Sequence, residues 1–301
     1  MANITVTEAA NFIPEIWVAS ALGALKANTV MARFVNRNYE EAIARQGDIL
    51  HIPKRGTLSV NTKMANTVVT LQTPSSDVVN LTLNQHKEVS FLVEDIAAAQ
   101  ANQDIIGGYV TDAMMALAED IDAAILALYT GFSSTPIDAT SGSGGITAES
   151  VTEARRILNA AKVPQEGRFI VWHEDAEAEL LGIEKFTSSD FGDPGDAVRE
   201  AVIGRKYGFT HAMDQQVVAV AGEVKNLAFH RDAIVLATRP LPPPPANTGA
   251  QSAVMSEDGI GIRVIYAYNP SYLGVQVTLD ILYGVAELRD SHAVVIRSTE
   301  V

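Results

Sequence analysis

Residues 47–92 constrain the fold most, because they alternate apolar and polar side chains over several short runs separated by turn residues. Such alternation predicts β-strands, and the pattern favours a long two-stranded ribbon with a polar tip around Lys63. A two-stranded ribbon is only marginally stable in water, and this one has few large apolar side chains. We therefore expect it to lie on another surface, and a neighbouring copy of the same chain is the most economical candidate.

A long helix is predicted after the ribbon, from Asp104 to Leu128. At 1.5 Å per residue it would be roughly 37 Å long. Its apolar residues recur at spacings of three and four and form one stripe, whereas Glu119, Asp120 and Asp122 fall off that stripe. The stripe consists of Ile105, Tyr109, Ala113, Leu117, Ile121, Ile125 and Leu128. It predicts a face that packs into a core rather than a cofactor site.

A second domain is expected after the Gly/Ser-rich connection of residues 130–150. Ser150 and Glu153 have the spacing of a helix-capping box and predict the start of its first helix. Helical and strand patterns then alternate up to a proline run, which favours a mixed α/β domain with a central sheet. Beyond it, two long strands joined by "NPSYLG" predict a hairpin that returns to the long helix.

Composition excludes several classes of protein. The chain has 301 residues, 47% of them hydrophobic, and a net charge of -14. Sequence-specific binding of nucleic acid needs a basic face, which this balance argues against. The absence of cysteine excludes disulfides, thiolate metal sites and a cysteine nucleophile. No apolar run approaches the length of a membrane span, and the first residues lack the pattern of a signal peptide.

Two triplets resemble kinase motifs, "DFG" at residues 190–192 and "HRD" at 230–232. A kinase places an Asn five positions after the HRD Asp, and its DFG follows the HRD along the chain. Here Ala237 stands at the Asn position and the DFG comes first. The glycine-rich loop and the phosphate-pairing lysine strand of kinases are also missing, so a phosphotransfer site is not predicted.

Two further patterns could hold a metal. The run "HEDAE" begins like a zinc-protease helix, but Glu177 occupies the position of the second histidine. His173 is therefore expected to end a strand or cap a helix. The carboxylates of Asp190, Asp193 and Asp196 recur every three residues in a Gly/Pro loop, which leaves a weak cation site open beside ordinary loop turns. We predict no catalytic, cofactor-binding or metal-binding residue.

Four segments, in this order, are similar to one known family. They are "NFIPEIWVASAL" (11–22), "GDILHIPK" (47–54), "VIGRKYGFTHAMDQQV" (202–217) and "LAFHRDAIVLATRPL" (227–241). Together with the order of arm, ribbon, long helix, mixed domain and hairpin, they resemble the major capsid proteins of tailed bacteriophages, which have the Hong Kong 97-type fold. The resemblance assigns the HRD triplet to a sheet.

The resemblance implies an α+β fold in five parts. These are an N-terminal arm (1–46), an extended β-loop (47–92), a peripheral domain with a spine helix (93–140), an axial α/β domain (141–258), and a β-hairpin with a C-terminal strand (259–301). It implies a non-enzymatic shell subunit that forms hexamers and pentamers, encloses double-stranded DNA in the virion and assembles in the bacterial cytoplasm. A separate scaffolding protein, a portal and decoration proteins are the other implied partners, with no membrane and no cofactor.

The residues expected at contacts between subunits are Phe12, Ile16 and Trp17 in the arm and Lys63 and Met64 at the ribbon tip. Some relatives join a lysine to an asparagine of a neighbour by an isopeptide bond. The neighbours of Lys63 give no sign of the apolar pocket that this reaction needs, so non-covalent particles are predicted. An encapsulin-like compartment shell on the same fold and an enzyme built on the triplets remain as alternatives.

Overall fold

The computed structural model describes residues 30–39, 49–56, 58–73, 76–95, 105–143, 145–187, 203–245, 249–257 and 260–300. Its helices are α4 (Ile105–Leu126), α5 (Ala148–Ala160), α6 (Glu174–Leu181) and α7 (Glu184–Thr187), with 3₁₀ turns at η1 (Met31–Arg33), η2 (Ala127–Gly131), η3 (Ser141–Ser143), η5 (Arg231–Ala233) and η6 (Asp290–His292). Its strands are β1 (Ile49–Arg55), β2 (Ser76–Thr82), β3 (Gln85–Glu94), β4 (Ile137–Ala139), β5 (Arg168–Trp172), β6 (Arg205–Lys206), β7 (Phe209–Met213), β8 (Ala219–Val220), β9 (Glu223–His230), β10 (Ile234–Arg239), β11 (Ala250–Glu257), β12 (Ile260–Asn269), β13 (Gly274–Glu287) and β14 (Ala293–Thr299).

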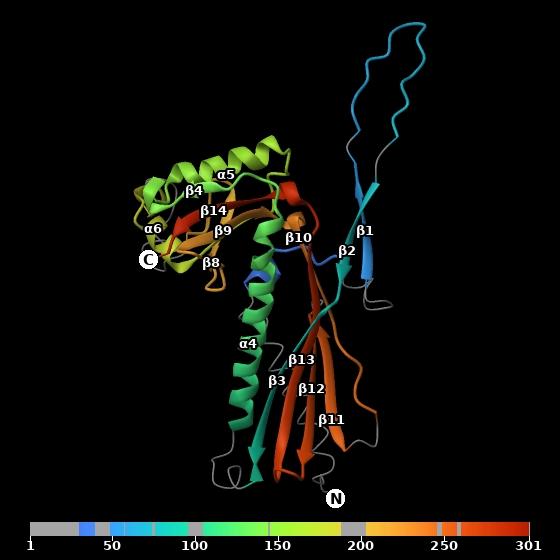
Figure 1. Cartoon of the computed structure of the whole chain (residues 1–301), viewed down its shortest axis with the longest axis vertical. Coiled ribbons are helices and arrows are strands. Elements are labelled where there is room, and N and C mark those ends of the chain that lie inside the picture. The colour runs from blue at the N-terminus through green and yellow to red at the C-terminus, as the bar shows by residue number, and fades with distance from the viewer. Residues whose placement is uncertain are drawn as a thin grey trace, which may run out of the picture.

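A seven-stranded sheet forms one end of the molecule, with strand order β4-β14-β9-β5-β7-β6 and β8 paired to β9. Helices α5 and α6 lie against it (Figure 1). Apolar residues of α5, such as Val151 and Leu158, are fully buried in a core that also contains Trp172 and Phe209. This core belongs to the mixed α/β domain that the alternating pattern predicted.

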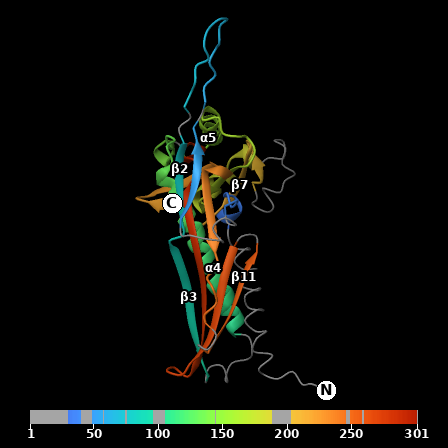
Figure 2. The same ribbon diagram turned by 90° about the vertical axis from the view of Figure 1, so that its right-hand side faces the viewer.

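A five-stranded sheet and α4 run side by side along the long axis (Figures 1 and 2). Strand β13 is its centre, pairing with β3 on one side and with β12 and β10 on the other, while β11 extends the sheet beyond β12. The hairpin of β12 and β13 was predicted. The strand β11 was not, because its run "AQSAVMSE" contains few large apolar residues.

Helix α4 spans Ile105–Leu126, close to the predicted range, and continues as the 3₁₀ turn η2. Its predicted stripe is buried at Ala113, Leu117, Ile121 and Ile125. Asp120 links the helix to the sheet. It accepts a hydrogen bond from Tyr283 Oη at 2.6 Å and forms an ion pair with Lys87 Nζ at 2.9 Å. No helix within the described ranges is long and apolar enough to span a membrane.

The expected ribbon of residues 47–92 is too long. Strands β1 and β2 pair antiparallel, with Ile52 opposite Val79, but β3 leaves them and pairs with β13 over ten residues. Alternation of side chains identifies a strand without identifying its partner. Gly284 in β13 permits the crossing, since a Cβ there would collide with the carbonyl oxygen of Thr82.

The base of the ribbon also has a core within its own chain, contrary to expectation. It is formed by Ile52, Leu81, Leu83, Val235, Ala237 and Leu288. The ion pair from Lys54 Nζ to Asp290 at 3.1 Å adds a further link. Only the tip beyond the paired strands lacks such support.

The chain passes between the two sheets more often than the expected division allows. Strands β10 and β11 were placed in the axial part (141–258), yet both belong to the sheet beside α4, and β14 returns to the seven-stranded sheet.

The N-cap of α5 differs from the one that the sequence predicted. Thr147 is the N-cap of α5 and accepts from Ser150 N, whereas Glu153 pairs with Arg156 at 2.6 Å. Ser150 and Glu153 therefore each take part in a local hydrogen bond, but their spacing alone could not identify Thr147 as the N-cap.

Candidate functional site

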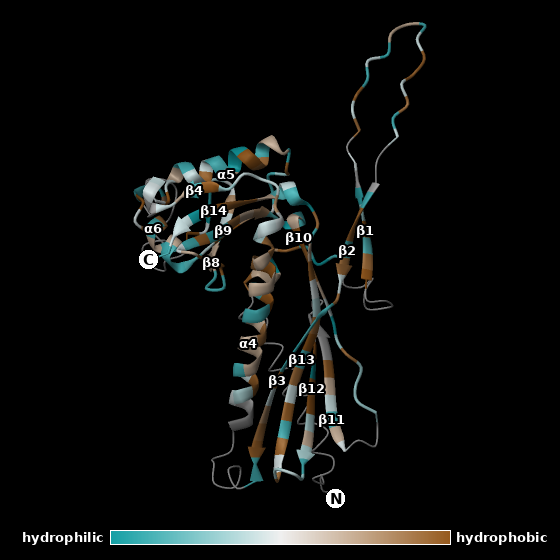
Figure 3. Cartoon of the chain, viewed as in Figure 1, coloured by the Kyte–Doolittle hydropathy of each residue, from teal (hydrophilic) through white to brown (hydrophobic). Residues whose placement is uncertain are grey.

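An extended loop of residues 58–73 projects away from the rest of the chain (Figure 1). Its sequence, "LSVNTKMANTVVTLQT", contains one charged residue, Lys63. Figure 3 shows hydrophobic stretches along it. Its large apolar side chains are exposed: Leu58, Val60, Met64, Val68, Val69 and Leu71, with Val60 fully so at 100%. A run of six exposed apolar side chains on one segment marks an interaction surface.

The two sides of this loop are held together by polar contacts rather than by strand pairing. Gln72 accepts from Ser59 N at 2.9 Å and donates its amide back to the Ser59 carbonyl oxygen. At the tip, Thr67 Oγ1 donates to the Met64 carbonyl oxygen at 2.8 Å, and Asn66 has a φ of 60°. Asparagine tolerates this left-handed conformation better than most residues. The loop therefore has a defined shape without a core.

The structure describes two of the five expected contact residues. Lys63 and Met64 lie at the exposed loop tip, as their place in the ribbon predicted, and the Met64 side chain is 71% exposed. Phe12, Ile16 and Trp17 lie outside the described residues. Contact of these five residues with a neighbouring subunit is a proposal.

A buried carboxylate that the sequence reasoning missed joins η1 to α4. Asp122 is 2% exposed, although it falls off the apolar stripe of the helix. Its carboxylate accepts hydrogen bonds from the backbone N–H groups of Val30, at 2.7 Å, and Met31, at 3.2 Å. The partners are backbone groups 92 and 91 positions away, so no side-chain pattern could have indicated the contact.

Burial raises the pKa of Asp122 to about 7, with the nearby charge of Asp214 adding to the effect and the backbone hydrogen bonds opposing it. Burial also raises the pKa of Asp214. Both carboxylates line a hollow of about 230 Å³ together with Glu119. The carboxylates of Asp122 and Asp214 therefore resist ionisation in this hollow.

The kinase-like triplet forms a structural turn. His230 ends β9 and caps η5, where its Nδ1 accepts from Asp232 N at 3.1 Å. Asp232 in turn accepts from Asn36 Nδ2 at 2.8 Å. The DFG triplet and the three aspartates for which a weak cation site was left open, Asp190, Asp193 and Asp196, lie outside the described residues.

His173 caps a helix, as predicted. It is the N-cap of α6, and its Nδ1 accepts from Asp175 N at 3.4 Å. Within the described part of the chain, no group of three or more His, Asp or Glu side chains is arranged to hold a metal ion.

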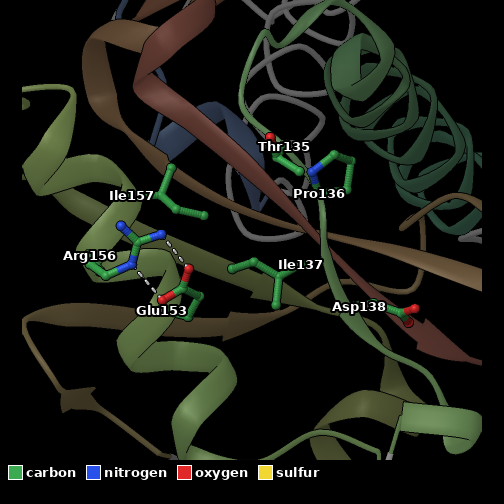
Figure 4. A pocket seen from close by; sticks show the side chains of 7 residues that line it. All are labelled: Thr135, Pro136, Ile137, Asp138, Glu153, Arg156 and Ile157. Carbon is green, nitrogen blue, oxygen red and sulfur yellow. Dashed lines mark hydrogen bonds and ion pairs between the residues drawn. The ribbon is translucent and has the colours of Figure 1, made fainter.

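A hollow of about 460 Å³ lies between α5 and the segment leading into β4 (Figure 4). Its lining residues are Thr135, Pro136, Ile137, Asp138, Glu153, Arg156 and Ile157. Arg156 and Glu153 face each other in an ion pair, so their charges are already satisfied (Figure 4). The lining offers neither an activated nucleophile nor an acid–base pair with separated pKa values, which a catalytic pocket would need.

Comparison with known proteins decides between the functions that the sequence left open. The model of the family described as phage capsid protein matches residues 41–240, which is more than half of the chain. The chain belongs to the phage capsid protein family. It is a structural component of the virion shell, not an enzyme, and subunits of this kind assemble with copies of themselves. No curated protein sequence matches the chain.

Solved structures agree on the Hong Kong 97-type fold of this capsid protein. A structure from Mycobacterium phage Che8 is 22% identical with a TM-score of 0.66, covering 89% of this chain and 90% of the other. The capsid of cyanophage P-SCSP1u is 15% identical with a TM-score of 0.65, covering 91% and 89%. A virus-like particle from Pyrococcus furiosus is 11% identical with a TM-score of 0.52, covering 94% and 98%. The compartment-shell alternative is thus less well supported than the phage head.

Proposed function

We propose that the capsid protein uses residues 58–73 to hold a neighbouring subunit in the shell. The observation that carries this proposal is the exposure of six large apolar side chains on a loop with a single charge. Full burial of one Val, Leu or Met side chain contributes about 1.5–3 kcal/mol. Burial of even half of them outweighs a surface ion pair, which is worth about 0–1 kcal/mol.

The anchored base favours this use of the loop. Strands β1 and β2 are fixed to the body by the apolar cluster around Ile52 and Leu81 and by the Lys54–Asp290 ion pair. A fixed base directs the tip toward one place on the neighbour and reduces the entropy lost on contact. Lys63 and Met64, at the tip, are proposed as contacts, and Phe12, Ile16 and Trp17 are proposed to supply a second contact from the arm.

The wider assembly is proposed on the same basis. Hexamers and pentamers require one chain to fit different neighbours, and the Gly-rich residues 142–145 and the arm (1–46) are proposed to supply the hinges. The remaining boundaries of the five-part division are also proposals, apart from the corrections made by β3, β10, β11 and β14. A separate scaffolding protein, a portal and decoration proteins are proposed as further partners. The net charge of -14 would keep the shell from binding packaged DNA tightly.

Limited trypsin digestion tests the loop contact. Cleavage after Lys63 is expected to be fast in dissociated subunits, because the loop has no core, and slow in assembled shells, where a neighbour covers it. The variant Lys63→Gln removes the cleavage site and identifies the band. Equal cleavage in subunits and shells would contradict the proposal.

A further inference from the structure

Three arginines line a hollow of about 300 Å³ at the outer end of the seven-stranded sheet. Arg155 comes from α5, Arg168 from the start of β5, and Arg205 from the edge strand β6. The other lining residues are Gln165, Glu166 and Gly208. The lining carries three positive side chains and one carboxylate, a local surplus of positive charge in a chain whose net charge is -14.

Two of these guanidinium groups are fixed by the backbone. Arg168 is 3% exposed and donates from Nε to the Pro164 carbonyl oxygen and from Nη2 to the Val163 carbonyl oxygen, both at 2.7 Å. Arg155 Nη1 donates to the Tyr207 carbonyl oxygen at 2.8 Å. Carbonyl oxygens orient a guanidinium but carry no charge that neutralises it. The positions of both groups are thus set before any ligand arrives.

The turn between β6 and β7 completes the arrangement. Tyr207 and Gly208 have φ values of 51° and 83°, and a Cβ on Gly208 would lie 3.1 Å from Arg155 Nη1. Glycine therefore permits both the turn and the close approach of Arg155. The turn leaves Arg205 exposed at the edge of the sheet, beside the two fixed groups.

The like charges in the hollow disfavour one another. Burial and the neighbouring charge of Arg155 lower the pKa of Arg168. A buried cation beside another cation is costly, and an anion placed between them removes that cost. Paired guanidinium groups present N–H donors in a planar fork that matches a carboxylate or phosphate.

We propose that this hollow binds an Asp or Glu side chain of a second copy of the capsid protein. The inference rests on the proposed function, because a shell brings acidic neighbours to every subunit. The chain has 36 Asp and Glu residues against 22 Lys and Arg, so a neighbouring copy is a rich source of carboxylates.

Charge reversal at Arg205 tests the contact. Arg205 is exposed on a two-residue edge strand, so Arg205→Glu is expected to leave folding intact. Because a charge-assisted contact is lost, the subunit concentration needed for assembly should rise by about tenfold in light scattering. The matched control is Arg156→Glu, with the same change of charge on an exposed residue of α5 outside this hollow. Equal behaviour of the two variants would overturn the inference.

A cross-link identifies the partner. The variant Arg205→Lys keeps the charge and introduces an amine, which carbodiimide joins directly to a carboxylate in contact with it. Assembled shells should give a new link between two subunits that the unsubstituted protein lacks, and peptide mass spectrometry would name the acidic residue. A link only to Glu166 of the same chain, or no new link, would overturn the inference.

The outcomes separate this inference from the proposed function. If trypsin cleaves after Lys63 equally fast in dissociated subunits and in shells, the proposed function of the loop fails, whatever the behaviour of Arg205→Glu. If shells form and Arg205→Glu assembles normally, only the contact at this hollow fails. Normal assembly of Arg205→Glu combined with weaker retention of DNA would assign the hollow to phosphate and overturn the carboxylate proposal.

Discussion

The carboxylate of Asp122 accepts a hydrogen bond from the backbone N–H of Val30 at 2.7 Å, joining the later part of the N-terminal arm (1–46) to the C-terminal half of α4. Met31, the next residue, is fully buried in the core between α4 and the five-stranded sheet. Beyond it, Asn36 N donates to the Ile234 carbonyl oxygen at 3.0 Å. Residues 30–36 are therefore fixed at both ends, and Asp122 fixes the end nearer the N-terminus.

The first prediction concerns the pH dependence of this joint. The pKa of Asp122 is about 7 in the fold against an ordinary value of 3.8, so the folded state holds its proton more tightly than the unfolded state. The stabilising effect is complete below about pH 4 and is lost as the pH rises through 7, at a cost of up to about 4 kcal/mol. Urea unfolding of the dissociated subunit at pH 5 and pH 8 should show lower stability at pH 8.

Substitution isolates this effect. Asp122→Asn removes the titrating group but keeps an oxygen that accepts a hydrogen bond, so the loss of stability between pH 5 and pH 8 should shrink by a few kcal/mol. Asp112→Asn, on an exposed position of the same helix, is the matched control and should leave the loss unchanged. The described charged groups that face Asp122 in its hollow are Glu119 and Asp214. An unchanged pH dependence in Asp122→Asn would assign the effect to Asp214 or to other groups.

The second prediction concerns the exposed loop. Val60 is fully exposed in the single chain, so Val60→Asp should change the free energy of unfolding of the subunit by less than about 0.5 kcal/mol. If a neighbour covers Val60, the same substitution buries an unpaired charge and should abolish assembly in light scattering. Val220→Asp, on a half-exposed residue of β8 outside the loop, serves as the control. Normal shells from Val60→Asp would show that the loop stays in solvent at Val60.

The sequence predicted much of this fold because the signals were local. The stripe of α4 and the alternation in β12 and β13 follow from repeating patterns that neighbouring residues share. The partner of β3 and the burial of Asp122 could not be predicted in this way. Phe91 alternates in β3 as it would in a ribbon, and Asp122 reads as a surface carboxylate, because the groups that decide both outcomes are distant in the sequence.

The exposed loop and its base show what local sequence patterns can predict and what they cannot. Its tip residues Lys63 and Met64 were predicted from turn chemistry, which is local. Its base was expected to lack a core, but Ile52 packs with Val235 from the region of the HRD turn. Contacts of that kind depend on the topology, which a single sequence indicates only through resemblance.

The third prediction concerns covalent bonds between subunits. An isopeptide bond from Lys63 would need a desolvated amine beside an asparagine and a catalytic glutamate. Lys63 lies on an exposed loop whose other residues are uncharged. Boiled particles should therefore run as a monomer of 32.2 kDa on a denaturing gel. A ladder of higher bands that disappears in Lys63→Gln would prove this prediction wrong.

The last prediction concerns the force that drives assembly. With a net charge of -14, subunits repel one another at low salt, and this repulsion decays over a Debye length of about 10 Å at 0.1 M salt. The favourable contacts must then be mainly apolar, from the loop and from arm residues such as Trp17. Apolar contacts strengthen on warming near room temperature because their driving force is entropic. Assembly yield should rise with moderate salt and from cold to ambient temperature, and Trp17→Ala should lower it. Light scattering across a salt and temperature series measures this, and assembly favoured by low salt and cold would mean that ion pairs such as the one proposed at Arg205, rather than burial, hold the shell.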